Sequence, residues 1–191
     1  MTRASQEGTA WTILVMLSVA HMLNDTMQSV IAASYPILKE SFALDYGQIG
    51  LVTMCFQMTA SVLQPLVGIF TDRHPMPFSL AIGMSSTLIG LILMAVAPSF
   101  AVLLVAVGLI GTGSAVFHPE SSRMARLDSG GRHGFAQSLF QVGGNTGSAL
   151  GPLLATFVVL PFGRPSVAWF AGLALVGIGL LTRVGVWGRE R

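Results

Sequence analysis

His21-Met22-Leu23-Asn24-Asp25-Thr26-Met27-Gln28 interrupts an apolar run that extends over residues 11–33. Its strongly polar side chains follow the spacing i, i+3, i+4 and i+7, which places them on one face of a helix: His21, Asn24, Asp25 and Gln28. A membrane-spanning helix must turn such a stripe away from lipid, towards other helices or a water-filled cavity. The stretch therefore predicts a membrane helix whose polar face the rest of the chain surrounds.

The composition places the whole chain in the same class. Of the 191 residues, 52% are hydrophobic and 9% are charged, whereas soluble domains carry about 25% charged residues. The mean hydropathy is +0.72. We therefore expect an integral membrane protein. The net charge of +2, without a basic stripe, argues against a nucleic-acid partner. Cys55 is the single cysteine, so an intramolecular disulfide and a cysteine zinc cluster are excluded.

Six segments are long and apolar enough to cross a bilayer, which takes about 20 residues per helix. They cover residues 11–33, 47–71, 77–97, 100–117, 134–160 and 165–187. The links between them are short, and the longest covers residues 120–133. The sequence therefore predicts an all-α fold: one six-helix transmembrane bundle over residues 1–191.

Positive charges are distributed unevenly over the links and ends of this bundle. One side carries eight arginines: Arg3, Arg73, Arg123, Arg126, Arg132, Arg183, Arg189 and Arg191. The other side carries only Lys39 and Arg164. Links rich in lysine and arginine remain in the cytoplasm, so both termini are expected to face the cytoplasm.

Two further segments carry polar faces with helical spacing. In the second segment the face consists of Gly50, Thr53, Gln57, Ser61, Gln64 and Gly68, and in the fifth it consists of Gln137, Gln141, Gly144 and Ser148. Buried amides need hydrogen-bond partners, and a cavity that holds water or a polar solute supplies them. The alternative is that the amides bond one another across helices. The polar faces thus indicate a shared cavity or a set of interhelical hydrogen bonds.

Small residues form a second pattern in the fifth segment. Gly143, Gly147, Gly151 and Ala155 recur every four residues, which permits close approach of another helix. Pro152 follows Gly151 directly and is expected to bend the helix.

The ionisable residues of the apolar segments are candidates for proton exchange. Burial disfavours the charged form of a carboxyl, so Asp25 is the first candidate to gain and lose a proton. His21, one turn away, can share the proton, bind substrate, or be a neutral histidine that bonds a neighbouring amide. His118 and Glu120 end the fourth segment and suggest a gate or a proton path. The alternative is an interfacial helix end in which Glu120 pairs with Arg123 at i+3.

The sequence carries no motif for catalysis or cofactor binding. It lacks a nucleophile motif, a metal-ligand spacing and a phosphate-binding glycine loop. We therefore expect no enzymatic activity, no metal and no cofactor, and any active transport must draw on an ion gradient.

The stretch Gly68-Ile69-Phe70-Thr71-Asp72-Arg73 resembles the signature loop between the second and third helices of the major facilitator superfamily. The resemblance implies that Gly68 permits close helix approach. It also implies that Asp72 caps a neighbouring helix or pairs with an arginine, a contact that latches the two halves of such transporters in the outward-facing state. Arg73 is carried over with Asp72. The basic cluster that usually follows is replaced here by His74-Pro75-Met76-Pro77.

Further pieces resemble the fosmidomycin-resistance branch of bacterial drug exporters within that superfamily. They are His21…Asn24-Asp25, Gln64-Pro65-Leu66-Val67-Gly68, Thr71-Asp72-Arg73-His74-Pro75, Gly111-Thr112-Gly113-Ser114-Ala115-Val116-Phe117-His118-Pro119-Glu120 and Phe140-Gln141-Val142-Gly143-Gly144-Asn145. Gly147-Ser148-Ala149-Leu150-Gly151-Pro152 is similar to the antiporter motif of the fifth helix. Each piece is weak alone, but they follow one another in the right order over nearly the whole chain.

The resemblance implies a secondary transporter of the cell inner membrane, surrounded by lipid, that exports small drug-like or polar molecules by proton antiport. Such transporters have twelve helices in two halves, and this chain matches the N-terminal half. We therefore expect a half-size transporter that works as a homodimer or with a C-terminal half from another chain. The alternative is a non-transporting truncated fragment.

The candidate residues fall into two groups. Those expected for proton coupling or substrate binding are Asp25, His21, Asn24, Gln28, Gln57, Gln64, Gln141 and His118. Those expected for gating or helix packing are Gly68, Asp72, Arg73, Glu120, Arg123, Gly147, Gly151 and Pro152.

Overall fold

The structure is a computed structural model that describes residues 3–74 and 76–190, with side chains from residue 11 onward. Arg191 and the side chain of Arg3, two of the eight arginines expected on the cytoplasmic side, lie outside the described residues. Pro75 of the signature loop also lies outside them.

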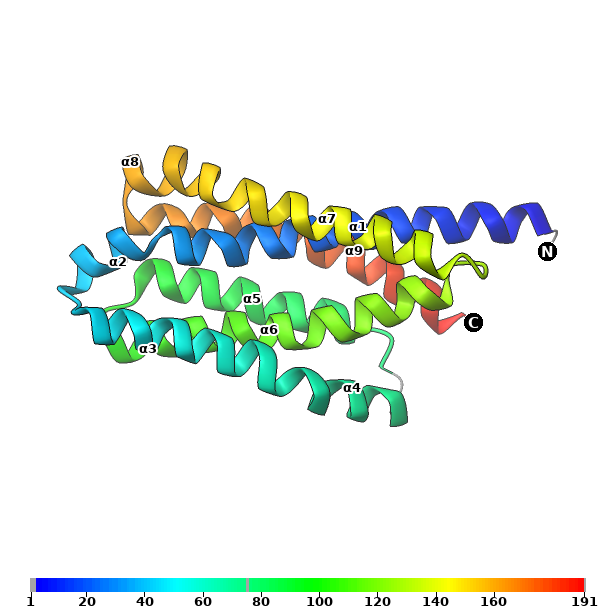
Figure 1. Cartoon of the computed structure of the whole chain (residues 1–191), viewed down its shortest axis with the longest axis horizontal. Helices are drawn as coiled ribbons and strands as arrows, with labels where there is room; N and C mark the ends of the chain where they lie inside the picture. The colour runs from blue at the N-terminus through cyan, green and yellow to red at the C-terminus, as the bar shows by residue number, and fades with distance from the viewer. Residues whose placement is uncertain (1–2, 75, 191) are drawn as a thin grey trace.

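The described chain consists of helices joined by short links. Its elements are α1 (Arg3–Ala33), α2 (Tyr35–Phe42), α3 (Tyr46–Gln57), the π-helix η1 (Met58–Val62), α4 (Leu63–Arg73), α5 (Ser79–Val96), α6 (Phe100–Leu127), α7 (His133–Leu154), the π-helix η2 (Ala155–Val159), α8 (Leu160–Phe162), the 3₁₀-helix η3 (Arg164–Phe170) and α9 (Ala171–Arg189). Figure 1 shows long rods that run side by side, with the Arg3 end of α1 and the Arg189 end of α9 at the same end of the bundle.

Within the described residues, five continuous helical segments are long and apolar enough to cross a membrane: Tyr46–Arg73, Ser79–Val96, Phe100–Leu127, His133–Phe162 and Arg164–Arg189. Helix α1 is not among these segments. Its middle turns carry His21, Asn24, Asp25 and Gln28, which lower its mean hydropathy. Because α1 packs lengthwise inside the bundle, neighbouring helices rather than lipid surround much of this polar stripe.

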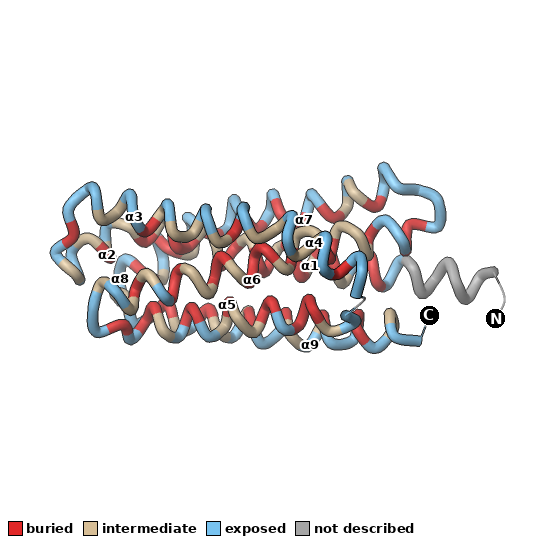
Figure 2. The backbone as a smooth tube through the Cα atoms, turned by 90° about the horizontal axis from the view of Figure 1, so that it is seen from below, coloured by how far each residue is buried: buried red, intermediate tan, exposed pale blue. Residues whose placement is uncertain are grey.

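The helices form two groups that meet along one side. Helix α1 packs mainly along α7 and also along α9, whereas α6 packs along α5 and along the rod α3–η1–α4. Contact between α5 and α9 joins the groups, and direct contact between α1 and α6 is limited. Figures 1 and 2 show the resulting bundle, with buried positions concentrated where α1, α5 and α6 face their neighbours. The polar site lies where α1 and α6 face each other.

The two flanking rods are the least covered parts of the bundle. In the most apolar stretch of Tyr46–Arg73 only 11% of residues are buried, and in that of His133–Phe162 only 22%, against 56% for Ser79–Val96. Both rods contain a π-helical turn, at Met58–Val62 and at Ala155–Val159. Such turns interrupt the regular α-helical ladder and often lie at functional sites.

Glycines decide how closely α7 approaches α1. A Cβ atom on Gly143 would collide with the Ser18 carbonyl, and one on Gly147 would collide with the Met22 carbonyl. On Gly151 it would lie 2.9 Å from the Thr26 carbonyl oxygen. The ridge of small residues therefore packs backbone against backbone on α1, the close helix approach that its spacing indicates.

Helix α6 continues past the end that the sequence predicted at residue 117. It runs through Pro119 to Leu127, so the link to α7 is shorter than the expected 120–133. A proline inside a membrane helix is tolerated where neighbouring groups satisfy the freed backbone. The extension is amphipathic: it buries Glu120, Ser121 and Ala125 and exposes Arg126. Such a segment is too polar for a hydropathy-based boundary to include.

Arg164 is one of the two basic residues on the side that the charge pattern places outside the cell. Its Nη1 donates to the carbonyl oxygens of Ala97 and Met94, at 2.6 and 3.4 Å, and its guanidinium lies 4.6 Å from the ring centre of Phe42. Unpaired carbonyls at a helix C-terminus favour a positive charge. Arg164 therefore caps the end of α5.

We expect Arg164→Ala to lower the free energy of unfolding by about 1–2 kcal/mol, because these carbonyls lose a charged donor. Thermal melting of the purified chain in detergent measures the effect. Arg183→Ala, which removes an exposed arginine within α9, serves as the control and should leave the melting temperature unchanged. Equal melting temperatures for Arg164→Ala and the parent would contradict the capping role.

Candidate functional site

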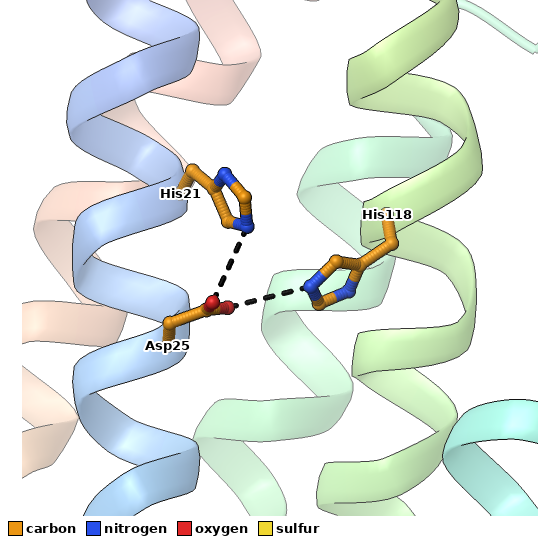
Figure 3. Close-up of side chains that lie close together, drawn as sticks. All are labelled: His21, Asp25 and His118. Carbon is orange, nitrogen blue, oxygen red and sulfur yellow. Dashed lines mark ion pairs between the residues drawn. The ribbon is translucent and has the colours of Figure 1, made fainter. Parts of the chain in front are cut away.

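Two helices that are distant in sequence bring three ionisable side chains together. Asp25 of α1 lies between two imidazoles: its Oδ2 is 3.3 Å from His21 Nε2, and its Oδ1 is 3.4 Å from His118 Nε2 of α6. Figure 3 shows the carboxylate facing both rings. The side chains of His21 and Asp25 are 3% and 17% exposed, and that of His118 is 29% exposed. We call these three residues the imidazole–carboxylate cluster.

The Nδ1 atom of each imidazole in the cluster lies against a backbone carbonyl oxygen. His21 Nδ1 lies 2.8 Å from the Phe140 carbonyl oxygen on α7, and the two rings stack with their centres 4.0 Å apart. His118 Nδ1 lies 3.1 Å from the Ser114 carbonyl oxygen of its own helix. A carbonyl oxygen only accepts hydrogen bonds, so each Nδ1 carries a hydrogen. The contacts thus fix the tautomer and point each Nε2 at Asp25.

This arrangement requires positive charge between the rings and the carboxylate. In a neutral ring with hydrogen on Nδ1, Nε2 presents a lone pair, which repels the lone pairs of a carboxylate oxygen. The repulsion turns into a hydrogen bond when a proton lies between the two atoms. Because the cluster contains two such contacts, its geometry suits one or two protons or another cation.

Gly144 makes room for the buried ring of the cluster. A Cβ atom at this position would collide with the His21 ring and would lie 2.6 Å from Nε2. Gly144 lies within the polar face that the sequence indicates on the fifth segment, but its contact with His21 has no signal in the sequence. Any larger residue there would displace the ring from Phe140 and Asp25.

A cavity of about 350 Å³ opens from the cluster. Its lining comes from α1, α4, α6 and α7: His21, Asp25, Gln64, His118, Pro119, Ser122, Gln137, Phe140 and Gln141. Apart from the cluster itself, these residues are amides, a hydroxyl, a proline and a phenylalanine. The three polar faces that the sequence predicted thus contribute to one cavity.

Amides of two of these faces also bond across helices, which was the alternative to a cavity. Ser114 Oγ donates to Gln28 Oε1 at 3.2 Å. Gln137 of α7 accepts from Ser122 Oγ at 3.1 Å and donates to the Ser122 carbonyl at 2.9 Å. The interhelical hydrogen bonds and the cavity therefore coexist.

Asn24 and Gln28 continue the polar stripe beside the cluster. Asn24 Nδ2 donates to Asp25 Oδ1 at 3.1 Å. Asn24 Oδ1 and Gln28 Nε2 are buried and have no hydrogen-bond partner among the described residues. Buried polar atoms without partners are costly. Neither residue lines the cavity, so a role for them in substrate binding stays a prediction.

The remaining sequence candidates form no hydrogen bond or ion pair with the cluster in the part of the chain that the structure describes. Gln57 is exposed at the end of α3 and does not line the cavity. Gln141 is exposed at the cavity, and its Nε2 donates to Asn145 Oδ1 at 3.2 Å. Pro152 is exposed and precedes η2, whereas Gly147 and Gly151 face α1.

The motif residues form a separate charged network at the end of the bundle where the termini lie. Arg123 of α6 lies 3.6 Å from Asp72 of α4 and 3.4 Å from Glu120. Buried Glu120 also accepts from Ser79 Oγ at 3.3 Å. The i, i+3 pair of Glu120 and Arg123 is thus present, and Glu120 points away from the cavity.

The other two motif positions make weaker contacts. Arg73 is exposed. A Cβ atom on Gly68 would lie 3.9 Å from Pro119 Cβ, which is an ordinary van der Waals distance. The approach of α4 to α6 at this point therefore does not require a glycine.

Four contacts that shape the site could not be predicted from the sequence. Phe140 and Ser114 supply the carbonyl oxygens that fix the imidazoles, Gly144 makes room for His21, and Ser122 binds Gln137. Every residue has a backbone carbonyl, so residue type does not indicate which carbonyl accepts a hydrogen bond from a side chain. Only the tertiary structure reveals them.

Long apolar helices that line a polar cavity with ionisable groups define a multi-pass membrane protein. The fold is similar to that of a peptide transporter, POT, crystallised with sulfate: the TM-score is 0.67 at 21% identity, over 91% of this chain and 37% of that chain. A mutant of the same transporter gives a TM-score of 0.68 at 20% identity, over 92% and 37%. The Major Facilitator Superfamily model matches residues 17–191, and the chain belongs to that superfamily.

Curated relatives support the narrower resemblance. The Fosmidomycin resistance protein of Escherichia coli (strain K12) is 55% identical over 94% of this chain and 44% of its own length. An uncharacterized MFS-type transporter of Bacillus subtilis (strain 168), YfnC, is 40% identical over 96% of this chain and 45% of its own length. The resemblance to the fosmidomycin-resistance branch is thereby confirmed. The chain spans less than half the length of these relatives.

Proposed function

We propose that this chain forms the proton-coupling half of a secondary transporter that exports small drug-like or polar molecules from the cell in exchange for protons. The carrying observation is Asp25, held between His21 and His118 at the wall of a 350 Å³ cavity. The three groups need one or two protons to satisfy their mutual contacts, and the cavity gives protons and solute a path to them. The proposal requires no covalent chemistry.

A second six-helix half is part of the proposal. The flanking rods expose polar residues, including Gln57, Ser61, Gln141 and Ser148. Polar side chains that face lipid are costly, so another protein surface is the natural cover for these rods. That cover is either a second copy of this chain or a C-terminal half of a related transporter, and it would enclose the cavity between two halves.

The proposed location is the cell inner membrane, with both termini in the cytoplasm. Both described chain ends lie at one end of the bundle (Figure 1), the end that also carries Arg73, Arg123, Arg126 and Arg132. The positive-inside rule assigns this end to the cytoplasm.

Growth of a bacterial strain that lacks its own fosmidomycin exporter tests the proposal. The chain is produced alone, or together with the C-terminal half of the Escherichia coli relative, and cells are exposed to fosmidomycin. Resistance above that given by the C-terminal half alone supports export. Resistance from the chain alone indicates a homodimer, and resistance only from the pair indicates a mixed assembly. No resistance in either arm, with both polypeptides found in the membrane, contradicts export of this compound class and favours a non-transporting fragment.

A further inference from the structure

We infer that His21, Asp25 and His118 form a binding site for one divalent transition-metal ion of the zinc class, with a fourth coordination position that opens to the cavity. The sequence alone does not show the complete ligand set, because His21 and Asp25 come from α1 and His118 comes from α6. The inference concerns cation binding by this chain and does not depend on the proposed export.

The separations between ligand atoms suit a tetrahedral metal. Zinc binds histidine nitrogen and carboxylate oxygen at about 2.0–2.2 Å, so neighbouring ligand atoms of a tetrahedral site lie about 3.4 Å apart. Each imidazole nitrogen has one carboxylate oxygen at about that separation: His21 Nε2 lies 3.3 Å from Oδ2 of Asp25, and His118 Nε2 lies 3.4 Å from Oδ1. One ligand atom from each residue lies within 4.8 Å of the others. Rotation of the Asp25 carboxylate and of the partly exposed His118 ring brings one oxygen and both Nε2 atoms onto one ion.

The hydrogen bonds on the far side of the two imidazoles match those around a metal-bound histidine. A metal-bound histidine usually donates its other N–H to a carbonyl or a carboxylate, which fixes the ring orientation. His21 donates from Nδ1 to the Phe140 carbonyl oxygen at 2.8 Å, and His118 donates to the Ser114 carbonyl oxygen at 3.1 Å. Both Nε2 lone pairs consequently face the Asp25 carboxylate, and a cation bound among the three groups relieves both repulsive contacts.

The donor set selects the class of metal. Two imidazoles and one carboxylate suit zinc, cobalt or iron(II), whereas magnesium and calcium prefer oxygen ligands alone. Three protein ligands with an open fourth position are typical of zinc sites that also bind water or a solute. Here the cavity supplies that position. Its remaining lining carries no ionisable group among the described residues, so no further charge competes with the ion.

Metal binding to the purified, tag-free chain in detergent tests the inference. Titration calorimetry with Zn²⁺ is expected to give one site per chain that excess Mg²⁺ does not occupy. Co²⁺ is expected to give the intense visible bands of a tetrahedral ion, a readout that needs no variant. Because Zn²⁺ takes the place of protons at the cluster, binding should release protons into a weakly buffered solution.

His118→Ala removes one ligand from the cavity side and should weaken Zn²⁺ binding at least about 100-fold, more than the loss of a second-shell partner. His74→Ala, at an exposed histidine stacked on Phe70, is the matched control and should bind like the parent. Thermal melting establishes that each variant is folded. Failure of the folded parent to bind Zn²⁺, or unchanged affinity in His118→Ala, overturns the inference. Either result leaves the export assay untouched.

Discussion

Asp25→Asn is expected to reduce proton-driven transport by the assembled transporter to the level of protein-free vesicles. Asparagine keeps the size and shape of the side chain but neither carries the negative charge nor takes up the proton. The carboxylate is the shared partner of His21 and His118, at 3.3 and 3.4 Å, so its loss uncouples both rings. Without the carboxylate, no negative charge favours the protonated form of the two imidazoles, so the cluster can no longer take up and release protons as the transporter changes conformation.

The measurement compares two modes of transport in reconstituted vesicles. Uptake driven by a pH gradient should disappear in Asp25→Asn, whereas exchange of labelled for unlabelled solute, which moves no net protons, should persist. That pattern separates a coupling residue from one needed for folding or solute binding. Asp45→Asn is the control, because Asp45 is an exposed helix cap and asparagine caps a helix equally well. Gradient-driven uptake at the parent rate in Asp25→Asn would refute the coupling role.

Gly147→Leu should have the largest effect on stability, with a loss of about 3 kcal/mol or more in the free energy of unfolding. A Cβ atom on Gly147 collides with the Met22 carbonyl and lies 2.9 Å from the Thr26 backbone nitrogen. These neighbours are backbone atoms of α1 and cannot rotate away, so α7 must move off α1. That shift also separates the Phe140 carbonyl from His21 and opens the site.

Size-exclusion chromatography and thermal melting of the detergent-purified chain measure the loss of folded protein. Gly179→Leu provides the control: Gly179 also lies inside a membrane helix, but a Cβ atom there meets nothing within 4 Å. It should elute and melt like the parent. A Gly147→Leu variant that elutes as a single species with the parent melting temperature would show that α1 and α7 do not need this close approach.

The membrane class, the helical fold and much of the cavity could be predicted from sequence, because they rest on local periodicity. The i, i+3, i+4 and i+7 spacing of His21, Asn24, Asp25 and Gln28 needs only the geometry of one helix. The small residues at Gly143, Gly147 and Gly151 likewise indicate a close helix contact by spacing alone. The end of α6 could not be located in this way, because the polar residues of its amphipathic last turns are also typical of a loop.

What the sequence alone determined, therefore, is a helical membrane fold and which residues share a face: the polar stripes and the ridge of small residues. The tertiary structure decided which faces meet. It brought His118 of α6 to Asp25 of α1 and directed Glu120, two residues further along α6, to Arg123 and Ser79 instead. It also supplied the Phe140 carbonyl that fixes His21. The physical reason is that periodicity fixes directions within one helix, whereas contacts between helices depend on packing over the whole bundle.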